Sequence, residues 1–327
     1  MGRCRVDTLT GVGRTVTHTM GTIFLVSMTA ACALAASNTT YSFLRNDVGA
    51  RAAALAGSFV SVTGDPNAIF YNPAGLATLD VSCGSAGFFK NVLDINSGHL
   101  SYSQKFEDLG YFGAGVIYTN YGTFTETDEA GNELGSFNAG DLALIAGYSN
   151  QLQENLFWGA NLKFIYSSIA GYRSTALALD AGLLYTFPES HATVGISVRN
   201  LGTQLQKYLS TREQLPLDVT IGGSIIPRGL PLLLNLNIHR LNDDQPSFIE
   251  HFRAFSLGGE FTLSKVIQFR VGLDNALRKD LKLGTTSGLA GFSSGLGITA
   301  GEYKVDYAIS LLGKIGNFHR ISIATTF

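Results

Sequence analysis

Trp158-Gly159-Ala160-Asn161-Leu162-Lys163-Phe164-Ile165-Tyr166-Ser167 alternates between apolar and polar side chains. Because side chains of a β-strand point alternately to two faces, one face carries Trp158, Ala160, Leu162, Phe164 and Tyr166. The other face carries Gly159, Asn161, Lys163 and Ser167. At about 3.3 Å per residue and a tilt of about 40°, the two terminal aromatic residues lie roughly 20 Å apart along a membrane normal, close to the apolar band of transmembrane barrels. The segment therefore predicts a tilted strand with its apolar face toward lipid.

The same alternation recurs from residue 81 to the end of the chain, for example over 194–199, 232–239, 267–274 and 303–311. About 14 such segments of about 9–12 residues follow one another, separated by turn-forming residues. A soluble β-sandwich or propeller also alternates. However, the apolar faces here are rich in Phe, Tyr and Leu and carry no charge, as lipid requires. We therefore predict an all-β protein whose residues 81–327 form a transmembrane antiparallel β-barrel of about 14 strands in the bacterial cell outer membrane, surrounded by outer-membrane lipid.

The last strand of this pattern ends on an aromatic residue. Its apolar face consists of Ile321, Ile323, Thr325 and Phe327. A terminal Phe on an alternating strand resembles the signal that outer-membrane barrels present to the barrel-assembly machinery, which is thus an expected partner.

The polar faces carry charges of both signs in the middle of strands, which a polar lumen permits. The expected lumen charges are Lys105, Lys163, Asp180, Arg199, Asp218, Glu260, Arg270, Asp274, Lys304, Asp306 and Arg320. Their signs nearly balance, whereas a charge-selective pore would show one dominant sign. We therefore expect ion pairs that fill the lumen. The aromatic belt at the membrane surfaces is expected to include Trp158, Tyr166 and Tyr303.

Residues 1–35 have the pattern of a secretory signal peptide. Arg3, Arg5 and Arg14 precede a short apolar run, and Ala33-Leu34-Ala35 matches a cleavage site. An uncleaved anchor and a lipoprotein attached at Cys32 are the alternatives. Beyond this segment Cys83 is the single cysteine, so no intramolecular disulfide is expected. The net charge of −2 gives no reason to expect nucleic-acid binding.

Residues 36–80 do not alternate and form a separate segment. The Ala-rich stretch 48–57 predicts a short, tightly packed helix. A brief strand is expected over Phe59–Val62, then a turn at 64–67. Asp65 or Asn67 is expected to cap a helical turn over 68–71, which Pro73 would end.

Two blocks of this segment, Gly49–Val60 and Asp65–Leu76, closely resemble the opening of PorV/PorQ-family outer-membrane proteins. The stretches 194–202, 303–308 and 315–322 agree with that family, and Asn72-Pro73-Ala74-Gly75-Leu76 is also similar to the FadL family of fatty-acid channels. The resemblance implies a 14-stranded barrel with an N-terminal hatch in the lumen. The hatch motif would comprise Gly49, Arg51, Gly57, Asp65, Pro66, Asn67, Asn72, Pro73 and Gly75. The alternative is that residues 72–76 form only a turn before the first strand.

The histidines lack the spacing of a zinc site, and neither a nucleophile elbow nor a phosphate loop occurs, so we expect no enzymatic activity, cofactor or metal. The PorV/PorQ resemblance implies a protein-docking component linked to type IX-like secretion, with secreted cargo proteins or secretion-system subunits as partners. The polar and acidic segment 120–138 is the main candidate for a docking loop. Segments 202–216 and 240–252 are two more long polar segments, and the side of the membrane that they face depends on the strand count. The alternative is that these segments are ordinary solvated loops. The alternatives to a docking function are a FadL-like channel for hydrophobic small molecules, with an apolar pocket beside the hatch and an opening in the wall, and a barrel with a purely structural role.

Overall fold

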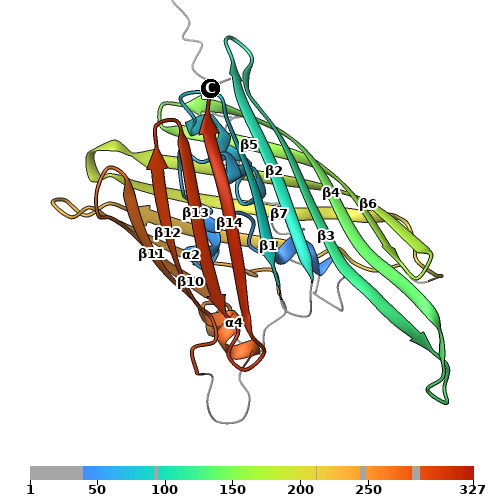
Figure 1. Ribbon diagram of the computed structural model, residues 1–327. Coiled ribbons are helices and arrows are strands. Elements are labelled where there is room, and N and C mark those ends of the chain that lie inside the picture. Colours follow the sequence, from blue (N-terminus) through green and yellow to red (C-terminus); the bar gives the residue numbers. More distant parts are fainter. Residues whose placement is uncertain (1–39, 92–94, 211, 244–247, 282–287) are drawn as a thin grey trace, which may run out of the picture.

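A closed barrel of 14 antiparallel strands forms the body of the protein (Figure 1). The computed structural model describes residues 40–91, 95–210, 212–243, 248–281 and 288–327. The strands are β1 Cys83–Lys90, β2 Asn96–Phe106, β3 Gly110–Thr127, β4 Glu133–Gln153, β5 Leu156–Ile169, β6 Tyr172–Phe187, β7 Ala192–Gln206, β8 Asp218–Ile225, β9 Leu232–Ile238, β10 Phe255–Thr262, β11 Ile267–Asp274, β12 Phe292–Ala300, β13 Tyr303–Leu311 and β14 Asn317–Thr326. Each strand pairs with its sequence neighbours, and β1 pairs with β14 over eight residues. The predicted fold class is confirmed, while the predicted signal peptide lies outside the described residues.

Side-chain burial follows the alternation along each strand. In β5, Leu162 and Phe164 point outward and are 52% and 38% exposed, whereas the intervening Lys163 is buried inside. Other exposed apolar residues, such as Leu236 and Ile321, repeat this pattern around the ring. Because a closed barrel with an apolar outer face satisfies its own backbone hydrogen bonds, it is stable in lipid. The protein is therefore an outer-membrane barrel.

The barrel wall is higher on one side than on the other. Strands β3–β7 have 14 to 21 residues, whereas β8–β14 have 7 to 10. The predicted length of about 9–12 residues is therefore correct for β2 and β12–β14, whereas β3–β7 are longer and β1 and β8–β11 are shorter. In Figure 1 the long strands slope away to the right of β14.

The two ends of the barrel differ in the length of their connections. Short turns lie at the end that holds the C-terminus, while the longest connections, 207–217, 239–254 and 275–291, lie at the other end. Outer-membrane barrels have short periplasmic turns and longer extracellular loops, so the C-terminal end is periplasmic. The candidate docking segment 120–138 and the two further polar segments, 202–216 and 240–252, all contain residues at the extracellular end.

Segment 120–138 is a β-hairpin rather than a loop. β3 and β4 continue to pair beyond the neighbouring strands as far as Thr127 and Glu133, with a bulge between Asn120 and Thr123. Both faces of this two-stranded ribbon are in water, so its composition is polar even though its backbone is extended. Similarly, residues 202–206 belong to β7.

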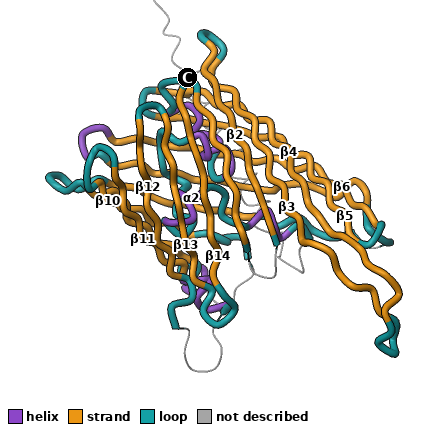
Figure 2. Tube along the Cα trace, in the orientation of Figure 1, coloured by secondary structure: helices purple, strands orange, loops and turns teal. Residues whose placement is uncertain are grey.

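In the part of the chain that the structure describes, short helices lie before β1 and in three of the connections between strands (Figure 2). They are η1 Ser42–Arg45, α2 Ala50–Ala54, η2 Pro66–Phe70, η3 Pro73–Thr78, η5 Pro188–Ser190, α3 Phe248–His251 and α4 Asn275–Asp280. Among the described residues, none of the helices combines the length and apolar character needed to span a membrane.

Candidate functional site: the lumen and its N-terminal segment

Residues 40–81, called the N-terminal segment below, lie against the inner face of the barrel. Two of its four helices are set by caps. The side chains of Asp65 and Asn72 each accept a hydrogen bond from the backbone N–H two residues later, and Pro66 and Pro73 occupy the first positions of η2 and η3. Pro73 therefore begins a helix instead of only ending the previous turn. The brief strand predicted over Phe59–Val62 is wrong, since these residues form a turn closed by a hydrogen bond from the Val62 N–H to the Phe59 carbonyl.

The segment approaches the wall closely where the wall carries glycine. A Cβ atom at Gly182 would lie 1.9 Å from Asn72 Oδ1, and one at Gly272 would lie 2.5 Å from the backbone nitrogen of Ala56. Further wall glycines that face the segment in this way are Gly159, Gly195, Gly222, Gly258 and Gly295. Any larger residue at these positions would displace the segment.

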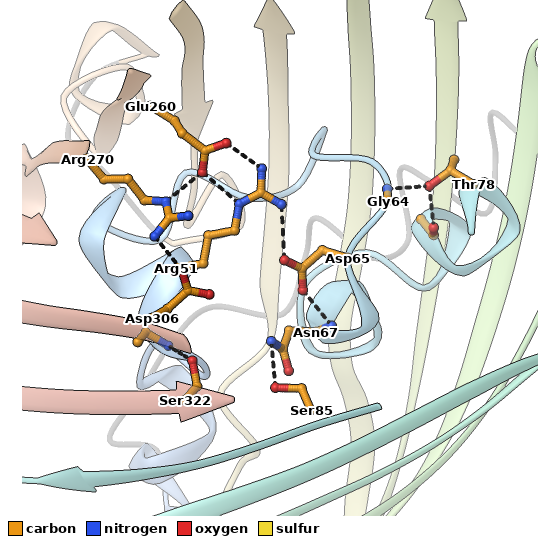
Figure 3. A network of polar contacts seen from close by, with 12 residues as sticks. Arg51, Gly64, Asp65, Asn67, Thr78, Ser85, Glu260, Arg270, Asp306 and Ser322 are labelled. Carbon is orange, nitrogen blue, oxygen red and sulfur yellow. Dashed lines mark hydrogen bonds and ion pairs between the residues drawn. The ribbon is translucent and has the colours of Figure 1, made fainter. Parts of the chain in front are cut away.

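Arg51 joins the segment to the wall through a buried network of charges (Figure 3). Its Nε and Nη2 each donate to a carboxylate oxygen of Glu260 at 2.8 Å, and its Nη1 donates to Asp65 Oδ2 at 3.1 Å. Glu260 also accepts from Arg270 Nε at 2.6 Å, and Arg270 Nη1 donates to Asp306 Oδ1 at 2.7 Å. Since an unpaired buried charge is costly, this network fixes α2 against β10, β11 and β13.

A second buried network lies on β5–β7. Lys163 Nζ lies 2.8 Å from Asp180 Oδ2 and donates to Asn200 Oδ1 at 2.9 Å. Asn161 Nδ2 donates to Asp180 and to the Ile69 carbonyl of the segment. Asn200 has a φ of 61° beside an irregularity in the β6–β7 register, and this local bulge turns its side chain inward next to Arg199.

The remaining lumen cations contact the segment or its surroundings. Arg199 forms an ion pair with Asp218, and its Nη1 donates to the Phe70 carbonyl at 3.2 Å. Arg320 Nη1 donates to Ser310 Oγ at 3.0 Å. Lys304 is half-buried on the inner face of β13.

Of the predicted lumen charges, Lys105 is exposed, whereas Asp274 lies at the rim and still lines a cavity together with residues of the N-terminal segment. Lys105 is exposed near the end of β2, where its ammonium group lies over the Tyr111 ring. Asp274 ends β11 at the extracellular rim, and its Oδ1 caps α4 by accepting from the Leu277 N–H at 3.0 Å. Both follow the inward alternation, but each lies near the end of its strand.

The other predicted motif residues of the segment have local structural roles. Gly49 and Gly57 flank α2 with φ values of 84° and 70°, which other residues rarely adopt. Asn67 contacts the first two strands, donating to Ser85 Oγ at 3.3 Å and accepting from Ser101 Oγ at 3.1 Å. Gly75 lies so close to Ala68 that a Cβ would be 2.7 Å from the alanine methyl group.

The inner wall of β3–β6 also carries a row of apolar residues that could not be recognised in the sequence. Ile117 pairs with Ala143, Ala143 with Ile165, and Ile165 with Ala176 across four neighbouring strands. All four are at most 4% exposed and belong to one hydrophobic cluster with Phe70 and other residues of the segment. We call these four residues the lumen apolar row. Ile145 and Ala178 are buried on the same inner faces of β4 and β6 and belong to the same cluster, but only the strand register reveals the row.

Aromatic residues gather at the periplasmic end of the outer face. Ring contacts connect Phe106, Phe112, Tyr148 and Trp158 in series, with centroids 5.2 to 5.5 Å apart. Tyr303 begins β13 at the same end, while Tyr166 lies toward the extracellular end of β5. In the C-terminal strand, Ile321, Ile323 and Phe327 are exposed on the outer face, and the Phe327 ring lies 6.1 Å from that of Tyr102. Thr325 is half-buried.

Cavities with charged residues in their lining lie beside the segment. One, of about 80 Å³, is lined by residues that include Arg45, Asp47, Asp218 and His239. Another, of about 280 Å³, is lined by residues that include Glu260. Among the described residues each of the 14 strands is hydrogen-bonded to both neighbours, although β7 pairs with β8 only as far as Arg199. The apolar pocket and the wall opening of the channel hypothesis therefore stay predictions.

Comparison with solved structures places this fold among known barrels. The toluene transporter TbuX of Ralstonia pickettii superposes with a TM-score of 0.59 at 12% identity over 86% of this chain and 98% of TbuX. The fold is that of the FadL-like channels. The Pseudomonas putida toluene transporter TodX gives 0.58 at 15% identity, covering 85% of this chain and 96% of TodX. A Pseudomonas aeruginosa FadL homologue gives 0.55 at 11% identity, covering 86% and 98%.

These structural neighbours include transport proteins and support the FadL-like part of the predicted resemblance, whereas they offer no support for the PorV/PorQ family. No protein-family model and no curated protein sequence matches the chain. Among the described residues, no group of three or more His, Cys, Asp or Glu side chains is arranged to hold a metal ion.

Proposed function

We propose that this barrel is a channel for hydrophobic small molecules across the outer membrane, and that its N-terminal segment is a movable hatch. The observation that carries the proposal is the lumen apolar row. When the segment moves away, Ile117, Ala143, Ile165 and Ala176 offer a hydrophobic solute a continuous contact surface along the inside of β3–β6. Such a surface favours apolar solutes because it removes their apolar area from water.

The attachment of the segment is consistent with a hatch. Arg51, Asn72 and the Phe70 carbonyl join it to the wall by hydrogen bonds and ion pairs. These contacts can exchange for water when the segment moves. The apolar packing on β3–β6 holds the closed conformation. TbuX and TodX are toluene transporters, so toluene is the first solute to test on this chain.

Toluene uptake by host cells that express the barrel tests the proposal. Expression should raise uptake above that of the same host without the barrel. Asn72 Nδ2 donates to the Val60 carbonyl in the segment and to the Leu183 carbonyl in the wall, so Asn72→Ala should loosen the hatch and raise the rate further. Uptake that does not depend on expression would refute the channel, and a rate unchanged by Asn72→Ala would argue against passage controlled by the hatch.

Protein docking is a second candidate function, as the PorV/PorQ resemblance implies. The observation that favours it is the projecting β3–β4 hairpin, which has an open strand edge on each side beyond Asn120 and Asn138. The rings of Phe124 and Phe137 stack on this hairpin with centroids 5.4 Å apart. At its tip, hydrogen bonds from Asn132 hold the pKa of Asp128 below its ordinary value, so the tip stays charged.

Affinity capture of secreted proteins with the intact barrel tests docking. A cargo protein that is recovered with the whole chain, and lost when residues 122–136 are replaced by a short Asn-Gly turn, would support it. Recovery of the same proteins with both forms, or of none with either, would count against the hairpin as a docking surface.

A further inference from the structure

The outer face of the barrel contains an apolar groove where β14 and β1 close the ring. The groove has a volume of about 710 Å³ and spans β13, β14, β1, β2 and β3. Its floor is formed by the small residues Ala86 and Gly98, and larger side chains rise around them, including Phe88, Leu100 and Tyr118. We call this depression the seam groove. Because it lies on the lipid-facing surface, an acyl chain can occupy it.

Cross-strand register places a polar row directly beyond the groove. Phe88 pairs with Gly98 and with Ile321 within the groove, and two residues farther along β1, Lys90 pairs with Asn96 and with His319. These three polar residues share the outward alternation of Phe88. β1 ends at Lys90 and β2 begins at Asn96, so the polar row lies at the extracellular end of both strands.

His319 is held by a neighbouring hydroxyl group. Its Nδ1 forms a hydrogen bond of 2.7 Å with the Tyr307 hydroxyl on the outer face. When Tyr307 donates to Nδ1, the ring proton sits on Nε2, which can then donate to an anionic oxygen. Lys90 adds a positive charge on a flexible stem that can reach the headgroup level of the membrane.

We infer that the seam groove and its polar row bind a phosphorylated lipid of the outer leaflet. One acyl chain lies on Ala86 and Gly98, and a headgroup phosphate contacts Lys90 and His319. The apolar groove and the polar row that complements a phosphate lie next to each other on β14, β1 and β2. This inference does not depend on solute passage, because the groove lies on the outside of a closed wall.

Lipid binding by the purified barrel in detergent tests the inference. Native mass spectrometry would compare bisphosphorylated lipid A with the same lipid after enzymatic removal of its phosphates. Bisphosphorylated lipid A should bind more tightly than the dephosphorylated lipid. Lys90→Gln should lower the affinity for the bisphosphorylated form by about fivefold, which is the effect of one lysine near an anionic surface. Lys279→Gln, a change at an exposed lysine on α4, is the matched control and should have no effect.

A second variant tests the groove itself. A Cβ at Gly98 meets no atom closer than 3.4 Å, so Gly98→Leu should fill the groove without disturbing the fold. The substitution should therefore weaken the binding of both the phosphorylated and the dephosphorylated lipid. Gly223→Leu, at an equally open glycine on β8, is its control. Folding of each variant is checked by heat-dependent migration on gels. Equal binding of the two lipid forms by the unaltered barrel, or equal effects of Gly98→Leu and Gly223→Leu, would overturn the inference.

Discussion

Arg51→Met should release the N-terminal segment locally while the barrel stays folded. The substitution removes two hydrogen bonds to Glu260 and one to Asp65. Asp65 then lies buried without a cation, whereas Glu260 keeps Arg270. Removing one partner of a buried ion pair typically costs about 3–5 kcal/mol, and we expect the lower part of this range because Glu260 stays paired. Asp65 belongs to the segment and is buried only while the segment lies against the wall. Most of the cost therefore weakens the attachment of the segment to the wall.

Hydrogen exchange in lipid nanodiscs measures this loss directly. The Ala53 N–H donates to the Gly49 carbonyl within α2 and should exchange only when the segment opens. A loss of about 3 kcal/mol would speed this exchange by roughly two orders of magnitude. Amides of β10 and β11 should keep their rates, since their ladder hydrogen bonds remain.

Two controls complete the measurement. Arg51→Lys keeps the charge but loses the two-pronged contact with Glu260, so it should give a smaller acceleration. Arg228→Met changes an exposed arginine in the β8–β9 turn and should change nothing in α2. Unchanged exchange in α2 of Arg51→Met, or an equal acceleration in β10 and β11, would refute the assignment of Arg51 as an attachment point of the segment.

Three further predictions concern the wall. Gly182→Ala places a methyl group against Asn72 and should destabilise the protein by about 1–3 kcal/mol in urea unfolding. Gly223→Ala, whose methyl group meets no close atom, should not destabilise it. Equal urea midpoints for the two variants would contradict the close contact at Gly182. Leu162→Arg puts a charge on the lipid face at mid-strand and should cost about 2–4 kcal/mol in reversible folding into lipid vesicles; a neutral result would mean that this face does not meet lipid. Phe327→Ala should slow the appearance of the heat-resistant folded form in cells, because it alters the expected assembly signal; normal kinetics would remove that role.

The barrel could be predicted from the sequence because lipid imposes one simple rule on every strand. The alternation of residues 158–167 assigned Leu162 and Lys163 to the correct faces, and repetition of that pattern gave 14 strands. The hairpin at 120–138 escaped prediction because both of its faces meet water, so neither face is apolar. Lys105 was misplaced because alternation gives the direction of a side chain but not its depth.

Contacts within the lumen depend on register, which a single sequence does not reveal. The lumen apolar row forms only where four strands pair in a particular register, and Asn200 reaches Lys163 only through a local bulge. The charges of the lumen could be listed from the sequence. Their pairing could not, because Arg51 and Glu260 are 209 residues apart and meet only when the barrel closes around the segment.

A reversible cross-link between the segment and the wall tests the central claim most directly. The hydroxyl oxygens of Ser61 in the segment and Ser224 in β8 lie 2.6 Å apart, so cysteines at both positions, in a Cys83→Ser background, should form a disulfide. Ser293 and Ser310, whose hydroxyl oxygens lie 3.0 Å apart within the wall, provide the control pair. We predict that oxidation of the first pair reduces toluene uptake to that of cells without the barrel, that a reductant restores it, and that the control pair has no effect. Full uptake through the oxidised first pair would contradict a hatch that must move.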